Sequence, residues 1–230
     1  MKKTLWIAIA GALAASVIAA SAQEVHSANA VGYIKKTLPA GGKLVAMSIP
    51  LDSMTNTSLV FGETSVASEA PVNSFVYFWD TATQVWSAGF KSGKGWGPAE
   101  AGYVLQPGEG FFLQGDPVVV TDVEVTITGE VPSDATLARS IPGGNSLGTS
   151  ANPYPVDFIF GDSDVAANAS VDSYVYFWDV DAQVWSAGFK SGKGWGPAEA
   201  GYVVQAGEGF FLQESGSVNQ WEETKPYTWP

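Results

Sequence analysis

The sequence predicts an all-β protein made of two tandem, antiparallel β-sandwich-like repeats of about 100 residues each. The block 74–114 recurs at 173–213 without a gap, and 35 of its 41 positions are identical. Short β-branched and aromatic runs alternate with Gly, Pro and Asn turn signals. No window beyond the first 22 residues has helical periodicity over ten residues. The repeats are therefore placed at 31–131 and 132–230.

The N-terminus has the pattern of a secretory signal peptide. Lys2 and Lys3 precede an apolar run over 5–20, and Ala20-Ser21-Ala22 is a small-x-small cleavage site. Residues 1–22 are predicted to be removed by cleavage after Ala22, and 23–30 to form a flexible lead-in. No later apolar segment is long enough to span a bilayer, so the mature chain is expected to be secreted or periplasmic.

The first repeat contains seven predicted strands. The aromatic run 74–79 places Phe75, Tyr77 and Trp79 on one face and apolar residues on the other, which is typical of a central strand. A four-residue turn, 80–83, leads into the next strand, whereas 91–98 has three glycines and a proline and is predicted to be irregular. The polar segment 51–70 remains ambiguous. The strands are expected at 31–38, 43–49, 74–79, 84–90, 103–105, 111–114 and 118–128.

The second repeat follows the same plan with a weaker opening and closing. Its opening, 137–144, parallels 34–41, and 221–229 stands where the closing strand is expected. Only four of fourteen positions match between 38–51 and 141–154, far fewer than in the block. Either the block was copied recently between the repeats, or its sequence is constrained in both.

Composition excludes several classes of function. The net charge of −12 disfavours nucleic-acid binding, which needs Lys and Arg against phosphates. Without cysteine the chain has no disulfide, thiol nucleophile or thiolate metal site. His26 is the only histidine, so a Ser-His-Asp triad or a multi-histidine zinc site is not available near the repeats. We expect no cofactor and no bound metal.

The irregular loop is the best candidate ligand site in each repeat. A tryptophan between glycines and beside lysines suits stacking on a sugar ring with a contact to its carboxylate or sulfate. Two such loops would bind a polymer with avidity. In the alternative, each tryptophan closes the open end of its own sandwich, and the lysines are solvated or protect strand edges. The candidate ligand-binding residues are Lys91, Lys94, Trp96, Lys190, Lys193 and Trp195.

Carboxylates offer a less specific route to function. Glu100 with Glu109, and Glu199 with Glu208, could serve as the acid and base of a small glycoside hydrolase. The alternative places Glu109 in its Pro-Gly-Glu-Gly turn as an acceptor of backbone N–H groups. The aspartates of the second repeat lack the spacing of an EF-hand and suit turns instead.

The motifs that open and close the first repeat resemble those of duplicated β-repeats in secreted and surface-attached bacterial proteins. The opening is Leu-Pro-Ala-Gly at 38–41 with Leu44, Val45 and Pro50, and the closing is Leu105-x-Pro-Gly-Glu-Gly-Phe-Phe, ending at Phe112. The second repeat keeps 207–211 but has Ala206 in place of the proline. The resemblance implies a β fold and export, and it implies no catalytic residues.

The sequence thus favours a secreted, non-enzymatic structural or adhesive protein of the bacterial surface or extracellular space. A carbohydrate-binding module that uses the Lys-Trp loops is the alternative, and a small hydrolase is the third. The expected partner is a polysaccharide or another surface protein.

Overall fold

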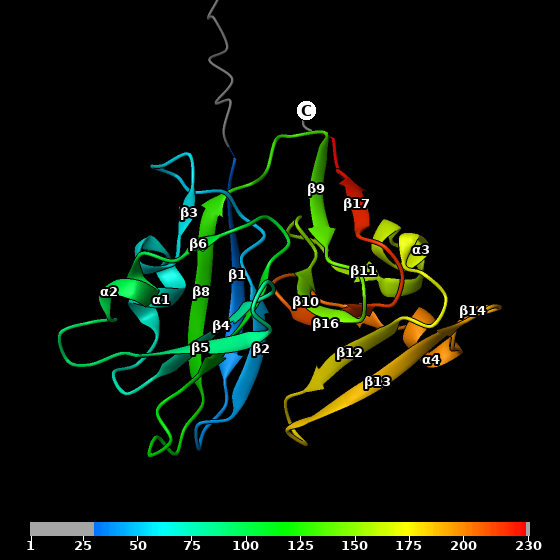
Figure 1. The fold of residues 1–230 in the computed structure, drawn as a ribbon. Coiled ribbons are helices and arrows are strands. Elements are labelled where there is room, and N and C mark those ends of the chain that lie inside the picture. The colour runs from blue at the N-terminus through cyan, green and yellow to red at the C-terminus, as the bar shows by residue number, and fades with distance from the viewer. Residues whose placement is uncertain (1–29, 229–230) are drawn as a thin grey trace, which may run out of the picture.

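The computed structural model describes residues 30–228 (Figure 1). The predicted signal peptide and all of the predicted lead-in except Ala30 lie outside these residues. Within them the chain is an all-β protein with antiparallel sheets and a few short helices, so the predicted all-β class is confirmed. No helix in the described range is long and apolar enough to cross a bilayer.

The first repeat has one main sheet and two ribbons of two strands each, one long and one short. The main sheet has the order β2-β7-β4-β5, β1 pairs with β8 over its whole length, and β3 pairs with β6. The elements are β1 (Val31–Leu38), β2 (Leu44–Ser48), β3 (Leu59–Val60), η1 (Phe61–Glu63), α1 (Ser65–Glu69), β4 (Phe75–Asp80), β5 (Val85–Phe90), α2 (Pro98–Ala101), β6 (Val104–Leu105), β7 (Gly110–Gln114) and β8 (Val123–Glu130).

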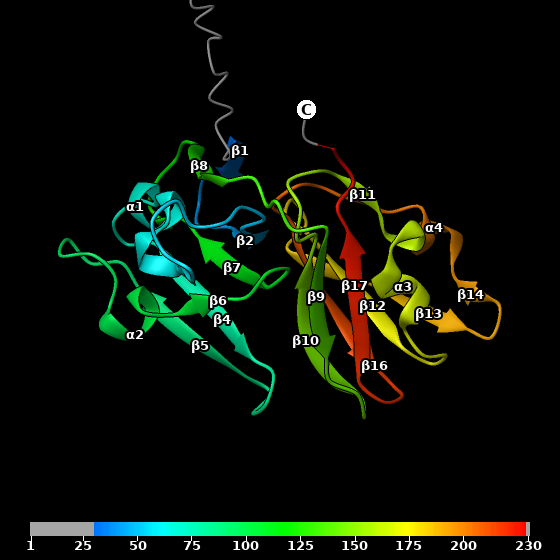
Figure 2. The same cartoon turned by 90° about the horizontal axis from the view of Figure 1, so that it is seen from above.

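The second repeat has the same topology and lies beside the first (Figures 1 and 2). Its main sheet has the order β10-β16-β12-β13-β14, and its ribbons are β9 with β17 and β11 with β15. The elements are β9 (Thr136–Ile141), β10 (Ser146–Ala151), β11 (Phe158–Ile159), η2 (Phe160–Asp162), α3 (Asp164–Asn168), β12 (Tyr174–Asp179), β13 (Val184–Ser191), β14 (Gly194–Trp195), α4 (Pro197–Ala200), β15 (Val203–Val204), β16 (Gly209–Glu214) and β17 (Asn219–Thr224).

Each repeat has a core of its own between the long ribbon and the main sheet. In the first, Val125 and Ile127 of β8 face Val76, Phe111 and Leu113 of the sheet, and all five are fully buried. Each such side chain contributes about 1.5–3 kcal/mol to folding. The core fixes which face of the sheet points inward, so it also fixes the residues on the outer face.

Three segments differ from the sequence-based expectation. The closing strand of the second repeat, expected at 221–229, is β17, which begins two residues earlier and ends at Thr224. The strand predicted at 118–128 begins only at Val123. Residues 116–119 form a turn instead, in which the Asp116 carboxylate accepts the Val118 N–H at 2.9 Å, and the Val119 carbonyl accepts the Gly41 N–H at 2.9 Å. The ambiguous segment 51–70 contains β3, η1 and α1. Since α1 has only five residues, it is too short to show a helical period. Thr64 caps it by accepting the Ala67 N–H.

Candidate functional site

The tryptophans of the two Lys-Trp loops pack against their own repeats. The Trp96 indole N–H donates to the Ala67 carbonyl at 2.8 Å, and its ring meets Phe61 edge-on at 5.3 Å between centroids. Trp195 makes the equivalent contacts in the second repeat, at 2.9 and 5.1 Å. Both side chains are half-buried and extend the hydrophobic cores.

One lysine of each loop is engaged in a similar way. Lys91 Nζ donates to three carbonyl oxygens at the end of α1, at 2.6 to 2.8 Å, and Lys190 does the same at the end of α3. These carbonyls have no partner within the helix, so a cation satisfies them. Burial lowers the pKa of both lysines. Only Lys94 and Lys193 are exposed. The contacts favour a structural role for the loops, and ligand binding by their six residues stays a prediction.

A second set of aromatic side chains lies on the outer faces of the main sheets. Alternation along β4 points Tyr77 and Trp79 away from the core, and the register pairs Trp79 with Trp86 and Tyr77 with Phe112. The second repeat presents equivalent residues, and the two outer faces meet in a third hydrophobic cluster. We call this set the aromatic groove; it comprises Tyr77, Trp79, Trp86, Phe112, Tyr176, Trp178, Trp185 and Phe211.

The junction between the repeats has an approximate two-fold axis. The Trp79 indole N–H donates to the Leu147 carbonyl at 2.7 Å, and the Gln84 amide pairs with the Leu147 backbone at 2.9 and 3.0 Å. Trp178 makes the reciprocal bond to the Leu44 carbonyl at 2.9 Å, and Gln183 pairs with that residue in the same way. Reciprocal contacts of this kind are typical of an isologous dimer interface. Here both halves belong to one chain, so the repeats pack as one body.

Backbone from both repeats meets at Gly110 and Gly209, which lie within the repeated Gly-Glu-Gly sequence. A methyl group on Gly209 would lie 2.8 Å from the Met47 carbonyl oxygen and 3.2 Å from the Gly110 Cα. The Ser48 N–H also donates to the Gly207 carbonyl across the junction at 3.0 Å. This packing gives a physical reason for the same glycines in both repeats, since each glycine makes room for its counterpart.

Trp86 and Trp185 differ from the other duplicated tryptophans. They are 41% and 37% exposed, and within residues 30–228 their indole N–H groups donate to no protein atom. Both rings are held edge-to-face by Phe112 and Phe211, with centroid distances of 5.3 to 5.6 Å. The groove thus presents two positioned indoles, each with a free donor.

Two pockets flank this pair of indoles, and both Trp86 and Trp185 line each of them. One has a volume of about 350 Å³ and includes Tyr176 and Asn145, and the other has about 400 Å³ and includes Tyr77. In the described part of the chain, no Asp, Glu, Lys or Arg side chain lines either pocket. The arrangement can bind a ligand by stacking and by hydrogen bonding through its indole and phenol groups.

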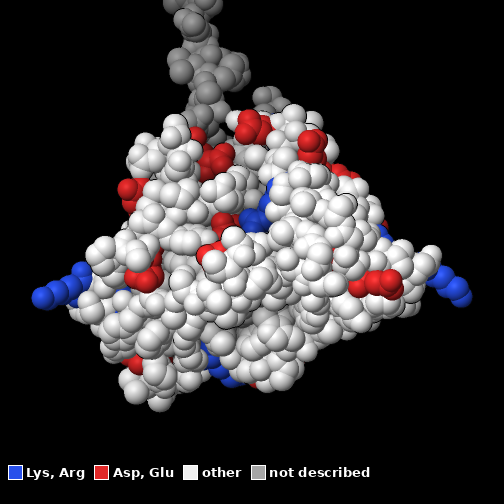
Figure 3. Space-filling model, in the orientation of Figure 1, with Lys and Arg blue, Asp and Glu red and all other residues white. Residues whose placement is uncertain are grey.

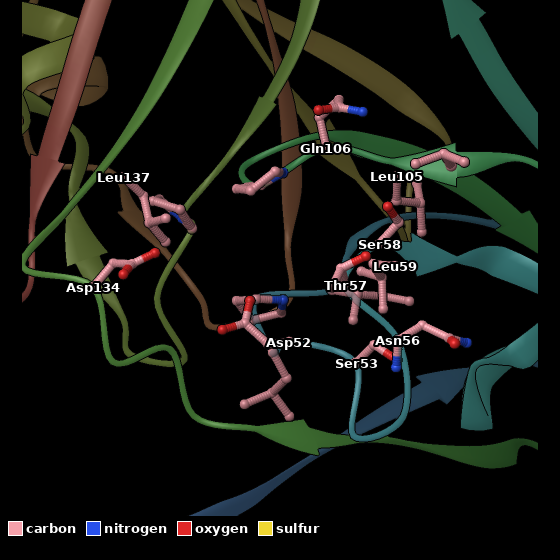
Figure 4. A pocket seen from close by; sticks show the side chains of 16 residues that line it. Asp52, Ser53, Asn56, Thr57, Ser58, Leu59, Leu105, Gln106, Asp134 and Leu137 are labelled. Carbon is pink, nitrogen blue, oxygen red and sulfur yellow. The ribbon is translucent and has the colours of Figure 1, made fainter. Parts of the chain in front are cut away.

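A separate, polar pocket of about 390 Å³ lies at the other side of the junction (Figure 4). Asp52 of the first repeat and Asp134 of the second both line it. Burial, and then the negative charges of Asp134 and Glu130, raise the pKa of Asp52. Among residues 30–228, no group of three or more ligating side chains is placed to hold a metal ion.

The glutamates considered for catalysis have different surroundings. Glu109 accepts the Tyr103 hydroxyl at 2.6 Å and the Gln106 N–H at 2.8 Å, as expected for a carboxylate in this turn. Glu208 makes the same two bonds in the second repeat at 2.7 and 2.9 Å. The side chain of Glu100 instead covers Gly89, where an added methyl group would collide with it. Turn and packing roles account for these groups.

Sequence reasoning selected Trp96 and Trp195 and missed Trp86 and Trp185. A signal was present, because alternation places Trp86 on the same face as Trp79 and Tyr77, and the opposite face of that sheet is also apolar. A sheet with two apolar faces needs a second cover or a ligand. Searches with this chain found no matching family model, no matching curated protein and no matching solved structure.

Proposed function

We propose that this chain is an exported, non-enzymatic adhesive protein that attaches to its target through the aromatic groove. The observation that carries the proposal is the pair Trp86 and Trp185, which are exposed, positioned and without hydrogen-bond partners within the described residues. Tryptophan and tyrosine are the side chains that most often dominate binding energy at interfaces. Export rests on the signal peptide that the sequence predicts.

The aromatic groove is a contiguous apolar surface, and such patches on soluble proteins mark sites of interaction. Phe90 and Phe189 are also exposed, at 44% and 41%, but they line neither pocket and pack on Phe75 and Tyr174 at 5.1 Å between centroids. The face in Figure 3 has charged side chains scattered between broad uncharged areas.

Rigidity also supports attachment rather than a purely structural role. The rings of Trp86 and Trp185 lie between Phe112 and Phe211, so little side-chain freedom is lost when a ligand binds. Neither pocket of the groove is lined by a titratable carboxylate, lysine or arginine among the described residues, so the chemistry that the groove supports is binding.

The test is attachment of residues 23–230, carrying a fluorescent label, to isolated envelopes of the bacterium that exports the protein. We expect saturable binding that weakens at least tenfold in the double variant Trp86→Ala, Trp185→Ala, as for loss of interface hot spots. The double variant Phe90→Ala, Phe189→Ala is the matched control, since it removes two equally exposed rings outside the groove. Equal binding by all three folded proteins would contradict the proposal.

A further inference from the structure

We infer that the ligand of the aromatic groove is a neutral polysaccharide, one chain of which crosses the approximate two-fold axis and contacts both Trp86 and Trp185. The inference rests on the proposed function, because it names the ligand of the same groove. It differs from the sequence-based hypothesis of an acidic polysaccharide on the Lys-Trp loops in both the site and the charge of the polymer.

The charge of the protein and of the groove favours a neutral ligand. The chain has 23 acidic and 11 basic residues, so an anionic polymer is repelled at long range. In the part of the chain that the structure describes, the groove supplies no cation to offset this repulsion and no carboxylate to attract a cationic ligand. The nearby Lys43 amine donates to the Asp181 carbonyl at 3.2 Å and lies 3.7 Å from that residue's carboxylate, so its charge is already balanced.

The mixture of groups in the groove fits a sugar ring. A pyranose has an apolar C–H face that packs on an aromatic ring and a rim of hydroxyl groups that need donors and acceptors. Trp86 and Trp185 supply exposed ring surface, and their N–H groups have no partner among residues 30–228. The Tyr77 and Tyr176 hydroxyls each donate to a glutamine side chain at 2.9 Å, which leaves their oxygens able to accept from a ligand. Asn145 also lines one of the two pockets.

The approximate symmetry determines how a polymer would lie. Each flanking pocket is lined by both Trp86 and Trp185, and the two pockets are related by the same axis as the repeats. A chain that crosses the axis meets equivalent groups on either side, so it can bind in either direction. Contacts on both sides act on one molecule, so affinity rises steeply with chain length until both pockets are filled and then levels off.

Other occupants are less well matched to these groups. A second copy of the protein would bring together two molecules that each carry a net charge of −12. An apolar peptide would cover the rings but would leave the indole N–H groups and tyrosine oxygens to be satisfied by its backbone alone. Both occupants are outcomes of the test described below.

The test is calorimetric titration of residues 23–230 with neutral polymers (mixed-linkage β-glucan, galactomannan, amylose and dextran) and with acidic ones (alginate and polygalacturonate). We expect binding of at least one neutral polymer, one chain segment per protein, and no binding of the acidic ones. The affinity should change by less than about threefold between roughly 0.05 and 0.5 M NaCl, because no ion pair is involved.

Variants then locate the site. Trp86→Ala with Trp185→Ala should weaken binding of the neutral polymer at least tenfold, and Trp86→Phe with Trp185→Phe should weaken it severalfold, because the ring remains but the N–H donor is lost. The Phe90→Ala, Phe189→Ala control should bind as the parent does. Unfolding midpoints in urea verify that each variant is folded.

The outcomes separate this inference from the proposed function. Groove-dependent attachment to envelopes that is abolished by protease, together with no response to any neutral polymer, would overturn the polysaccharide and leave the adhesive function standing. A dimer of the parent in light scattering that is lost in the Trp86→Ala, Trp185→Ala variant would assign the groove to a second copy. No groove-dependent attachment to envelopes and no binding of any polymer would overturn both proposals.

Discussion

Gly209→Ala tests the packing that joins the two repeats. A methyl group at this position would lie 2.8 Å from the Met47 carbonyl oxygen and 3.2 Å from the Gly110 Cα, and both are backbone atoms. Carbon and oxygen in good contact lie about 3.3–3.6 Å apart, so the junction must open by roughly half an ångström. Overpacking of this kind costs about 1–3 kcal/mol, whereas replacing glycine by alanine returns about 0.4–1 kcal/mol through the unfolded chain.

The net expectation for Gly209→Ala is a loss of about 1–2 kcal/mol in the free energy of unfolding, or a fall of about 2–8 °C in Tm for a chain of this size. Urea unfolding followed by tryptophan fluorescence measures the first, and calorimetry measures the second. Gly192→Ala is the matched control, because nothing lies within 4 Å of its added methyl group. It should leave stability unchanged or raise it slightly. Equal effects of the two substitutions would refute the account of the junction.

Two further predictions concern stability. Lys91→Met removes the ammonium donor from the end of α1. The Ala67 carbonyl keeps the Trp96 indole N–H, but the Ser68 and Ala70 carbonyls lose their donor. The variant should therefore lower the free energy of unfolding by about 1–3 kcal/mol, whereas the exposed Lys94→Met should change it by less than about 0.5 kcal/mol. Equal urea midpoints for these two variants would contradict the capping role. Burial raises the pKa of Glu223 from its usual 4.5 to about 7, with a smaller contribution from the charge of Asp164. The folded state therefore keeps this proton to a higher pH than the unfolded state does, and stability is lost as pH rises from about 4.5 to about 7. Glu223→Gln should remove this loss. The free energy of unfolding of the variant should therefore exceed that of the parent by about 1 kcal/mol at pH 8 and equal it at pH 4, after allowance for partial solvent screening of Glu223. Urea midpoints at the two pH values measure this difference. The same dependence of stability on pH in both proteins would refute the assignment of that dependence to Glu223.

Local sequence patterns predicted most strands because their causes are local. The strand predicted at 31–38 has the bounds of β1, and the central position predicted for 74–79 is that of β4 between β7 and β5. Alternation of side chains and the turn residues between strands depend only on near neighbours. The order of the strands in the second repeat could be predicted from the first repeat, because the block 74–114 recurs at 173–213.

The junction could not be predicted in the same way, because it depends on contacts between distant residues. Trp79 and Leu147 are far apart in sequence, and nothing in either segment indicates that one donates to the other. The glycines beside Trp96 suggested exposure, yet the loop folds back so that its indole N–H reaches the Ala67 carbonyl. Flanking glycines predict an irregular backbone, and they do not predict which way the side chain points.

The most direct test of the central claim is a nuclear magnetic resonance titration of the tryptophan indole N–H signals of residues 23–230 with the neutral polymer that binds in calorimetry. We expect the Trp86 and Trp185 signals to shift together and saturate, because both residues line both pockets and their indole N–H groups have no partner among residues 30–228. The Trp96 and Trp195 signals should stay in place, since each is bonded within its repeat. Shifts at Trp96 and Trp195, with none at Trp86 and Trp185, would contradict the account and return the site to the Lys-Trp loops.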